Sequence, residues 1–206
     1  MAELGEILLG KDNGDSLYEE TIRHFLGERT LIFNREVDEG VIEDYICYIL
    51  KWNKEDIDIS VEKRKPIRIL ISSPGGNTFS ANIMADVILQ SKTPVVGVAL
   101  DLVASASYTI YLACHERIAF ENSSFLQHEG EISMENSRSK FKQTVAFFEA
   151  METRAKDYIL SRTKMNEDFY DSIYEQEFWF DSKQAVHLGV VHKIIGVDCS
   201  IDEILS

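Results

Sequence analysis

Two short apolar runs, each followed by small or glycine-rich residues, constrain the fold most. RILISS (68–73) leads into Pro74-Gly75-Gly76, and VVGVAL (95–100) is followed by small residues around Ser105. Runs of this kind, rich in β-branched residues, are typical of strands that are covered on both faces of a parallel sheet. The sequence therefore predicts buried strands that end in tight turns.

Amphipathic segments alternate with these strands. Residues 38–52 have apolar positions at helical spacing, and Asp38 is suited to cap that helix. A second helix follows the glycine turn and places Ile83, Met84, Val87 and Ile88 on one face, and a third is expected over 104–114. The longest helix is expected to end near Arg162, with an apolar stripe of Phe141, Val145, Phe148 and Met151.

The second half of the chain continues the alternation. RIAF (117–120), SFLQ (124–127), FWFD (178–181) and VVHKII (190–195) are expected to be strands. Ser182 can cap a short helix that ends at Gly189. Strands and helices that alternate with right-handed crossovers indicate an α/β layered fold. With 206 residues and no internal repeat or linker, we expect one domain over 1–206.

Composition excludes several kinds of partner and cofactor. The chain has 21 basic and 35 acidic residues, a net charge of −14, and such a surface repels the phosphate backbone of nucleic acids. No run of apolar residues is long enough to span a membrane, and the first residues carry acids where a secretory signal is basic. We therefore expect a cytoplasmic protein. The three cysteines lack the pair spacings of a metal site, and no metal is expected.

Two residues are candidates for nucleophilic catalysis. Ser105 lies where an apolar strand gives way to a helix of small residues, and His128 follows the apolar run SSFLQ. A nucleophilic hydroxyl needs a base, a group that orients the base, and paired backbone donors for the oxyanion. Taken singly, Ser105 has the character of a helix cap and His128 that of a satisfied or exposed imidazole. Their order along the chain, together with the glycine turn before Ser105, supports a catalytic role for both residues.

In that order the sequence resembles the Clp protease proteolytic subunit over most of its length, from about Phe25 to Ile195. ERTLIFNREVD resembles the opening segment of that family, and ISSPGG resembles its SPGG turn. VASAS stands at the nucleophile segment, NSSFLQHEG at the histidine segment, and FWFDSKQAVHLGVV at the closing motif. The separation between the glycine turn and Ser105 is also the one expected in the family.

The resemblance implies a role for each matched residue. Ser105 would be the nucleophile, His128 the general base, and the backbone amides of Gly76 and Ala106 the oxyanion hole. Glu177 stands where the family has its aspartate, and Asp171 and Asp181 are neighbouring alternatives for the third member of the triad. Glutamate serves in this role in other serine hydrolases.

The resemblance also implies architecture and partners. The fold would be the ClpP/crotonase-like spiral of βαβ units, with an N-terminal segment over about 1–24 and a projecting handle over about 131–163. The protein would be a serine endopeptidase that forms rings of seven, paired into a tetradecamer. It would receive unfolded polypeptides from a separate AAA+ unfoldase ring, since this chain has no phosphate-binding loop of its own. No cofactor is implied.

Several positions depart from the family pattern and keep two alternatives open. Ser107 replaces a glycine, Asp101-Leu102 replaces a Gly-Gln pair, and Gln176 stands where relatives often have an arginine that pairs across rings. One alternative is a ring subunit that is weakly active or non-catalytic. The other is an enoyl-CoA hydratase-like enzyme with the same spiral fold, in which paired carboxylates would act and Ser105 and His128 would be idle.

Overall fold

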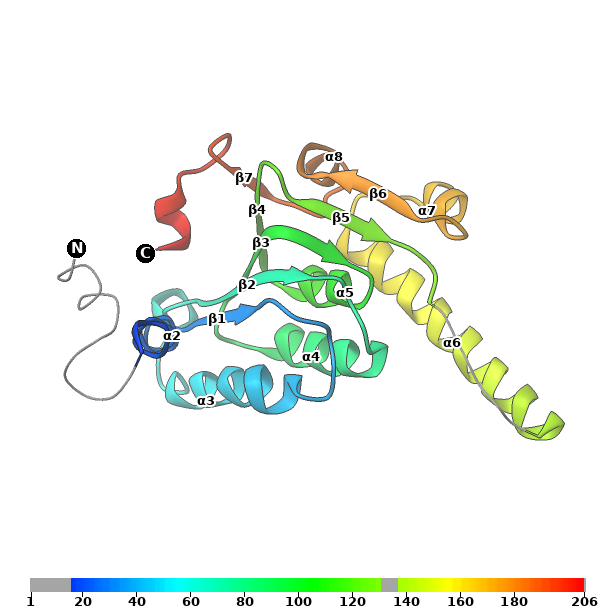
Figure 1. The fold of residues 1–206 in the computed structure, drawn as a ribbon, viewed down its shortest axis with the longest axis horizontal. Helices are drawn as coiled ribbons and strands as arrows, with labels where there is room; N and C mark the ends of the chain where they lie inside the picture. The colour runs from blue at the N-terminus through cyan, green and yellow to red at the C-terminus, as the bar shows by residue number, and fades with distance from the viewer. Residues whose placement is uncertain (1–15, 131–136, 206) are drawn as a thin grey trace.

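The computed structural model describes residues 16–130 and 137–205. A mainly parallel sheet carries most of its helices on one face, and one long helix projects from the body (Figure 1). Five strands run parallel in the order β1-β2-β3-β4-β7. Their bounds are Thr30–Phe33, Ile67–Ser73, Val95–Ala104, Glu116–Phe120 and Lys193–Ile195. The α/β spiral expected from the sequence is confirmed.

Strand β3 divides between two neighbours, and this division positions the site. Its first half pairs with β4, and its second half, Leu102–Ala104, pairs with β5 (Ser124–Gln127). The register of β3 against β2 shifts between Ile71 and Ser73. The extra residues lie in β3, and they bend that strand. Strand β6 (Phe178–Asp181) then adds to β5 in the antiparallel sense. The sequence predicted that β3 ends at Leu100, which is four residues too early.

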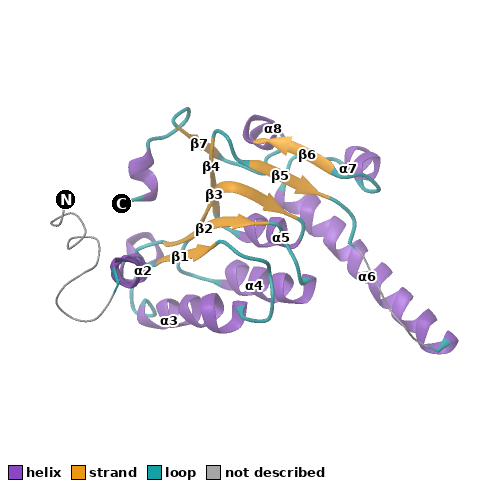
Figure 2. Ribbon diagram, in the orientation of Figure 1, coloured by secondary structure: helices purple, strands orange, loops and turns teal. Residues whose placement is uncertain are grey.

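The helices cover the face of the sheet that carries Ile67, Ile69 and Ile71, which belong to the main core (Figure 2). The covering helices are α3 (Cys47–Glu55), α4 (Thr78–Gln90) and α5 (Ala106–Ala113), with a π-helical turn over Ile42–Ile46 before α3. A smaller apolar cluster on Val96, Val98 and Ile118 is contacted by Ile204, from the short 3-10 helix Ile201–Ile204. The strands therefore have apolar neighbours on both faces, as their composition indicates.

Two helix caps differ from those expected. Asp38 does not cap a helix, because its carboxylate accepts the amide of Gly40 and pairs with Arg35 in the turn before the π-helical segment. Helix α8 (Ser182–His187) is capped by Asp181, which accepts the amide of Gln184 at 2.8 Å. The Ser182 hydroxyl instead donates to the carbonyl of Glu121.

Helices α2 (Leu17–Gly27) and α7 (Glu167–Ile173) were not anticipated from the sequence. Helix α2 lies between the first described residues and β1. It begins with a capping box formed by Ser16 and Glu19, and none of its residues is fully buried, although Leu26 packs against the main core. Helix α7 begins at a capping asparagine, Asn166, and buries Tyr170 and Ile173.

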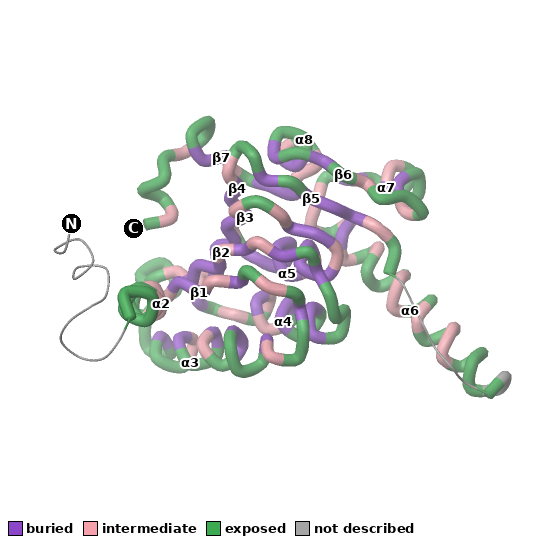
Figure 3. The backbone as a smooth tube through the Cα atoms, viewed as in Figure 1, coloured by how far each residue is buried: buried purple, intermediate pink, exposed green. Residues whose placement is uncertain are grey.

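Helix α6 (Arg138–Arg162) is the projecting element (Figure 1). Its base is held to α5, because the Tyr158 hydroxyl donates to the Thr109 carbonyl and Arg162 donates to two carbonyls at the end of α5. Burial decreases outward along the helix (Figure 3). The expected handle is therefore present over 138–162, and the rest of the predicted range lies largely outside the described residues.

Candidate active site

Ser105 lies at a sharp turn between the end of β3 and the start of α5. Its φ of 53° is in a region that residues with a side chain rarely adopt. Two backbone hydrogen bonds hold the turn: the Ser105 amide donates to the Leu126 carbonyl at 3.0 Å, and the Tyr108 amide donates to the Ser105 carbonyl at 2.9 Å. The hydroxyl is thereby placed beside the first amides of α5, whose partial positive charge favours a developing anion.

The glycine turn after β2 packs against Ser105 and requires both of its glycines. Gly75 has φ +101°, and a Cβ there would lie 2.6 Å from Cβ of Ser105. Gly76 has φ +139°, and a Cβ there would lie 2.4 Å from the carbonyl oxygen of Val37. Val37 bonds the carbonyl of Gly75 and the amide of Asn77, so the Gly76 amide between them takes part in neither bond. Because Gly75 and Gly76 have no side chain, the backbone of this turn can approach Ser105 closely.

Ser107 ties this turn to the neighbouring strand. Its hydroxyl is wholly buried, accepts from the Ala104 amide at 2.9 Å, and donates to the Ser73 and Ala104 carbonyls. The hydroxyl therefore joins the end of β2 to the end of β3 directly beneath Ser105. Ser107, which departs from the glycine of the family pattern, therefore has a structural role in the nucleophile turn.

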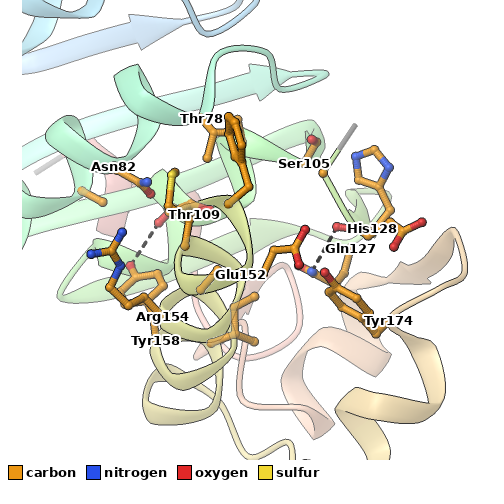
Figure 4. Close-up of a pocket in the computed structure, with 18 of the residues that line it drawn as sticks. Thr78, Asn82, Ser105, Thr109, Gln127, His128, Glu152, Arg154, Tyr158 and Tyr174 are labelled. Atoms are coloured by element: carbon orange, nitrogen blue, oxygen red, sulfur yellow. Dashed lines mark hydrogen bonds between the residues drawn. The ribbon is translucent and has the colours of Figure 1, made fainter. Parts of the chain in front are cut away.

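His128 follows the last residue of β5 and lines the same cavity as Ser105 (Figure 4). Its Nε2 is buried and has no hydrogen-bond partner. Across the part of the chain that the structure describes, no hydrogen bond joins Ser105 to His128. An unpaired imidazole nitrogen that is withdrawn from water, in a cavity that a serine hydroxyl also lines, can accept a proton from that hydroxyl or from a bound group.

Glu177 lies near the end of the ladder from which His128 continues. The last pair of strands β5 and β6 is Gln127 opposite Phe178; His128 follows β5 and Glu177 precedes β6. The Glu177 side chain is exposed and accepts from Nε1 of Trp179 at 3.4 Å. Within the described residues it makes no hydrogen bond or ion pair with His128. The two alternative acids have other partners: Asp171 pairs with Lys156 at 2.7 Å, and Asp181 caps α8.

The cavity in front of Ser105 has a volume of about 490 Å³. Its walls come from α4, the start of α5, the end of β5, the inner side of α6, and α7 with the residue after it, Tyr174 (Figure 4). Apolar side chains of the handle, Phe148 and Met151, contribute to the wall. This cavity is open enough for part of a polypeptide and has a hydroxyl and an imidazole at one side.

Comparison with known proteins identifies the family. The family model described as Clp protease matches residues 13–198. This chain belongs to the Clp protease family. Curated relatives are named ATP-dependent Clp protease proteolytic subunit 2: the Treponema pallidum protein is 25% identical over 186 residues, 89% of each chain, and the Pseudomonas aeruginosa protein is 25% identical over 190 residues, 90% of each chain.

A solved structure shares the fold. The ClpP1 mutant from Listeria monocytogenes superimposes with a TM-score of 0.73 at 23% identity, covering 85% of this chain and 95% of that one. The resemblance seen in the sequence is thereby confirmed for the family and for the fold. By family and by fold, the chain is related to proteolytic subunits of Clp proteases.

Other polar groups of the Clp-type fold have structural partners. Nδ1 of His115 accepts the Val95 amide, and Nδ1 of His192 accepts the Arg117 amide. Burial lowers the pKa of both imidazoles, with a further contribution from nearby arginines. Among the described residues, no group of three or more His, Cys, Asp or Glu side chains is arranged to hold a metal ion. No helix in the described part is long and apolar enough to cross a membrane.

Three residues of the site were not identified as functional from the sequence. Ser107 was noted only as a departure, and Glu152 and Tyr174, which line the cavity, were not singled out. Glu152 lies four residues after Phe148 of the apolar stripe, which places the two on the same face of α6. That spacing was a signal that this carboxylate lies near the inner face of the handle.

Proposed function

We propose that the chain is a serine endopeptidase in which Ser105 is the nucleophile and His128 the base. The hydroxyl oxygen of Ser105 attacks a peptide carbonyl while Nε2 of His128 takes its proton, and the same nitrogen then protonates the leaving amine. Water, deprotonated by His128, hydrolyses the resulting ester and restores the serine. The observation that carries the proposal is the buried, unpaired Nε2 of His128 in the cavity that Ser105 lines.

The amides of Gly76 and Ala106 are proposed as the oxyanion hole. Gly76 belongs to the turn that packs on Ser105, and Ala106 is the first residue of α5. Donors fixed in this way before substrate binds stabilise the tetrahedral intermediate without reorganisation, and one such donor contributes about 10²–10³-fold to the rate. The rigid turn supports this assignment.

Glu177 is proposed as the third member, reaching His128 after a change of rotamer. Its place next to the last pair of the β5–β6 ladder, Gln127 opposite Phe178, supports the assignment, because His128 is the neighbouring residue on the other strand. Its present contact with Trp179 is a single long hydrogen bond at an exposed position, which costs little to break. Catalytic hydrogen bonds are often long or misaligned before substrate binds and shorten in the complex.

Substrates and partners follow from the family. We propose that unfolded polypeptides are cleaved to short peptides, that an AAA+ unfoldase ring supplies them in the cytoplasm, and that no cofactor is needed for the acyl transfer. We further propose rings of seven, joined in pairs through the handle. Phe141 and Phe147, which are 48% and 49% exposed on the described handle, support this contact, since apolar rings on a projecting helix favour burial in an assembly.

A serine-reactive phosphonate tests the chemistry. Intact mass and peptide mapping should show one adduct per chain, on Ser105, and Ser105→Ala should lose both the adduct and the cleavage of a fluorogenic peptide while still folding. The variant Ser172→Ala, at an exposed serine of α7, is the matched control and should be labelled normally. Cleavage retained by Ser105→Ala, in a preparation free of host protease, would exclude Ser105 as the nucleophile.

Native mass spectrometry tests the assembly. With Gln176 in place of an arginine, the contact between rings should depend on apolar surface, which salt does not weaken. The mass of 14 subunits should therefore persist from low salt to about 0.5 M. A mass of seven subunits would mean that ring pairing is lost, and a monomer at micromolar concentration would contradict the compartment model.

A further inference from the structure

The cavity in front of Ser105 contains a carboxylate without a cationic partner. Glu152 is half-buried on the inner side of α6, and its carboxylate points into the cavity toward Gln127 and Tyr174 (Figure 4). No ion pair of Glu152 occurs in the described ranges 16–130 and 137–205. A charge in a partly enclosed site interacts more strongly than one in open water, so it is a strong determinant of what can bind.

The nearest cation by helical spacing is engaged elsewhere. Lys156 lies four residues after Glu152, the position from which a lysine normally pairs with a glutamate on the same helix. Its Nζ instead contacts Asp171 at 2.7 Å and Glu167 at 3.0 Å, both on α7. Helix α7 thus draws the lysine away, and the negative charge of Glu152 remains directed at the cavity.

The neighbouring groups strengthen this negative field. The pKa of the Tyr174 hydroxyl is raised, first by burial, then by the charge of Glu152 and by a hydrogen bond with that carboxylate, with Tyr170 and Glu129 contributing in the same direction. Arg154 is the one cationic residue among those that line the cavity in the described structure. Its guanidinium points past Tyr158 toward the other end, away from Glu152 (Figure 4). The end of the cavity near Gln127 and Tyr174 is therefore suited to a cation.

We propose that Glu152 makes the peptidase prefer a lysine or arginine side chain on the residue that contributes the scissile carbonyl. The inference rests on the proposed function, because it assigns a specificity to the cavity that holds Ser105 and the unpaired Nε2 of His128. A cationic side chain entering this cavity would be paired with Glu152 and would lie beside the ring of Tyr174, which also attracts cations. Glu152 is a specificity residue and takes no part in proton transfer.

The test uses two peptidyl phosphonates and two fluorogenic peptides that differ only in this side chain, lysine against norleucine, an uncharged analogue that lacks the terminal ammonium group. The readout is the lysine to norleucine ratio, both for kcat/KM and for the rate of labelling at Ser105. We expect the wild type to favour lysine by about tenfold, the ratio that corresponds to 1.4 kcal/mol, and Glu152→Gln to bring the ratio close to one. Glu152→Lys should instead favour a glutamate-bearing probe.

Glu149→Gln is the matched control, because Glu149 is an exposed carboxylate one turn earlier on the same helix and does not line the cavity. It should keep the wild-type ratio. A wild-type preference for norleucine, or a ratio that Glu152→Gln and Glu152→Lys leave unchanged, would overturn the specificity while leaving the peptidase intact. Failure of every phosphonate to label Ser105 would overturn the proposed function itself, and the specificity with it.

Discussion

The nucleophile turn and the segment that carries the proposed triad acid are built in different ways. The turn at Ser105 is held on several sides: by the hydrogen bond from the Ser105 amide to the Leu126 carbonyl, by the glycine turn at Gly75, and by the buried hydroxyl of Ser107. Glu177 is placed near His128 only by the end of the β5–β6 ladder, and its exposed side chain has one hydrogen bond in the described structure, to Trp179. The nucleophile turn is fixed by packing, whereas the position of the Glu177 carboxylate depends on the rotamer of a single side chain.

This difference shows which part of the triad is pre-organised. Backbone donors and a nucleophile at a strained turn need no movement when substrate arrives, whereas an exposed carboxylate must lose rotamer freedom before it can orient His128. We therefore expect small changes in the nucleophile turn to reduce activity strongly. Changes around Glu177 should do so only when they remove the carboxylate.

After the loss of Ser105 itself, the largest effect is expected from Gly75→Ala. The new methyl would lie 2.6 Å from Cβ of Ser105 and 2.7 Å from the Ala104 carbonyl oxygen, at a φ that disfavours alanine. Both the nucleophile and the Gly76 amide must move, and kcat/KM should fall about 10³-fold. Steady-state cleavage of a fluorogenic peptide measures this. Gly27→Ala, where the methyl meets nothing within 4 Å, is the control and should behave as wild type.

A smaller loss is expected from Glu177→Ala. Removing the carboxylate leaves His128 unoriented, and turnover should fall about 10²-fold by analogy with other triads. Asp171→Ala and Asp181→Ala are measured beside it, because those acids are neighbours in sequence that already pair with Lys156 and cap α8. If either reduces turnover more than Glu177→Ala while remaining folded, the acid has been assigned to the wrong residue.

Ser107→Ala should lower the free energy of unfolding more than Glu177→Ala does. It deletes a fully buried hydroxyl that links Ser73 to Ala104, and the unpaired backbone groups should lower the free energy of unfolding by about 1–3 kcal/mol. Urea titration measures this, with Ser172→Ala as a control whose hydroxyl is exposed. A change within about 0.5 kcal/mol would show that this hydroxyl does not hold the turn.

The smallest effect concerns pH. His115 and His192 accept backbone amides, and their pKa values are lowered in the folded state. The unfolded chain binds these protons at about pH 6.5, so the free energy of unfolding should fall as pH drops from about 7 to 5. The double variant His115→Gln, His192→Gln should show a shallower fall between the two pH values. An equally steep fall in that variant would assign the pH dependence to other groups.

Local patterns in the sequence predicted the elements that form the site. FWFD is a strand with the bounds expected, SFLQ ends immediately before His128, and the long helix ends at Arg162. These segments have strong periodicity or strongly apolar composition. The continuation of β3 to Ala104 was not predicted because Asp101 is polar, and the pairing that extends the strand comes from β5, far along the chain.

Features that depend on contacts between distant segments could not be predicted from local patterns in the sequence. The sequence ranked Glu177 by its place in a motif, but whether its carboxylate contacts His128 depends on a rotamer and on the competing donor of Trp179. The orientation of Glu152 into the cavity depends on α7, whose acids take the lysine that would otherwise pair with it. Helix α2 has apolar residues at helical spacing, Ile22, Phe25 and Leu26, and a capping box formed by Ser16 and Glu19, and the prediction overlooked both signals.

The most direct test of the account is to trap the acyl-enzyme. Acid quenching of the wild-type protein during turnover of a slowly hydrolysed peptide ester should yield a mass increase equal to the acyl group, which peptide mapping places on Ser105. The adduct should be absent in Ser105→Ala and should form far more slowly in His128→Ala. Peptide hydrolysis without an adduct on Ser105, or an adduct that persists in Ser105→Ala, would contradict the central claim.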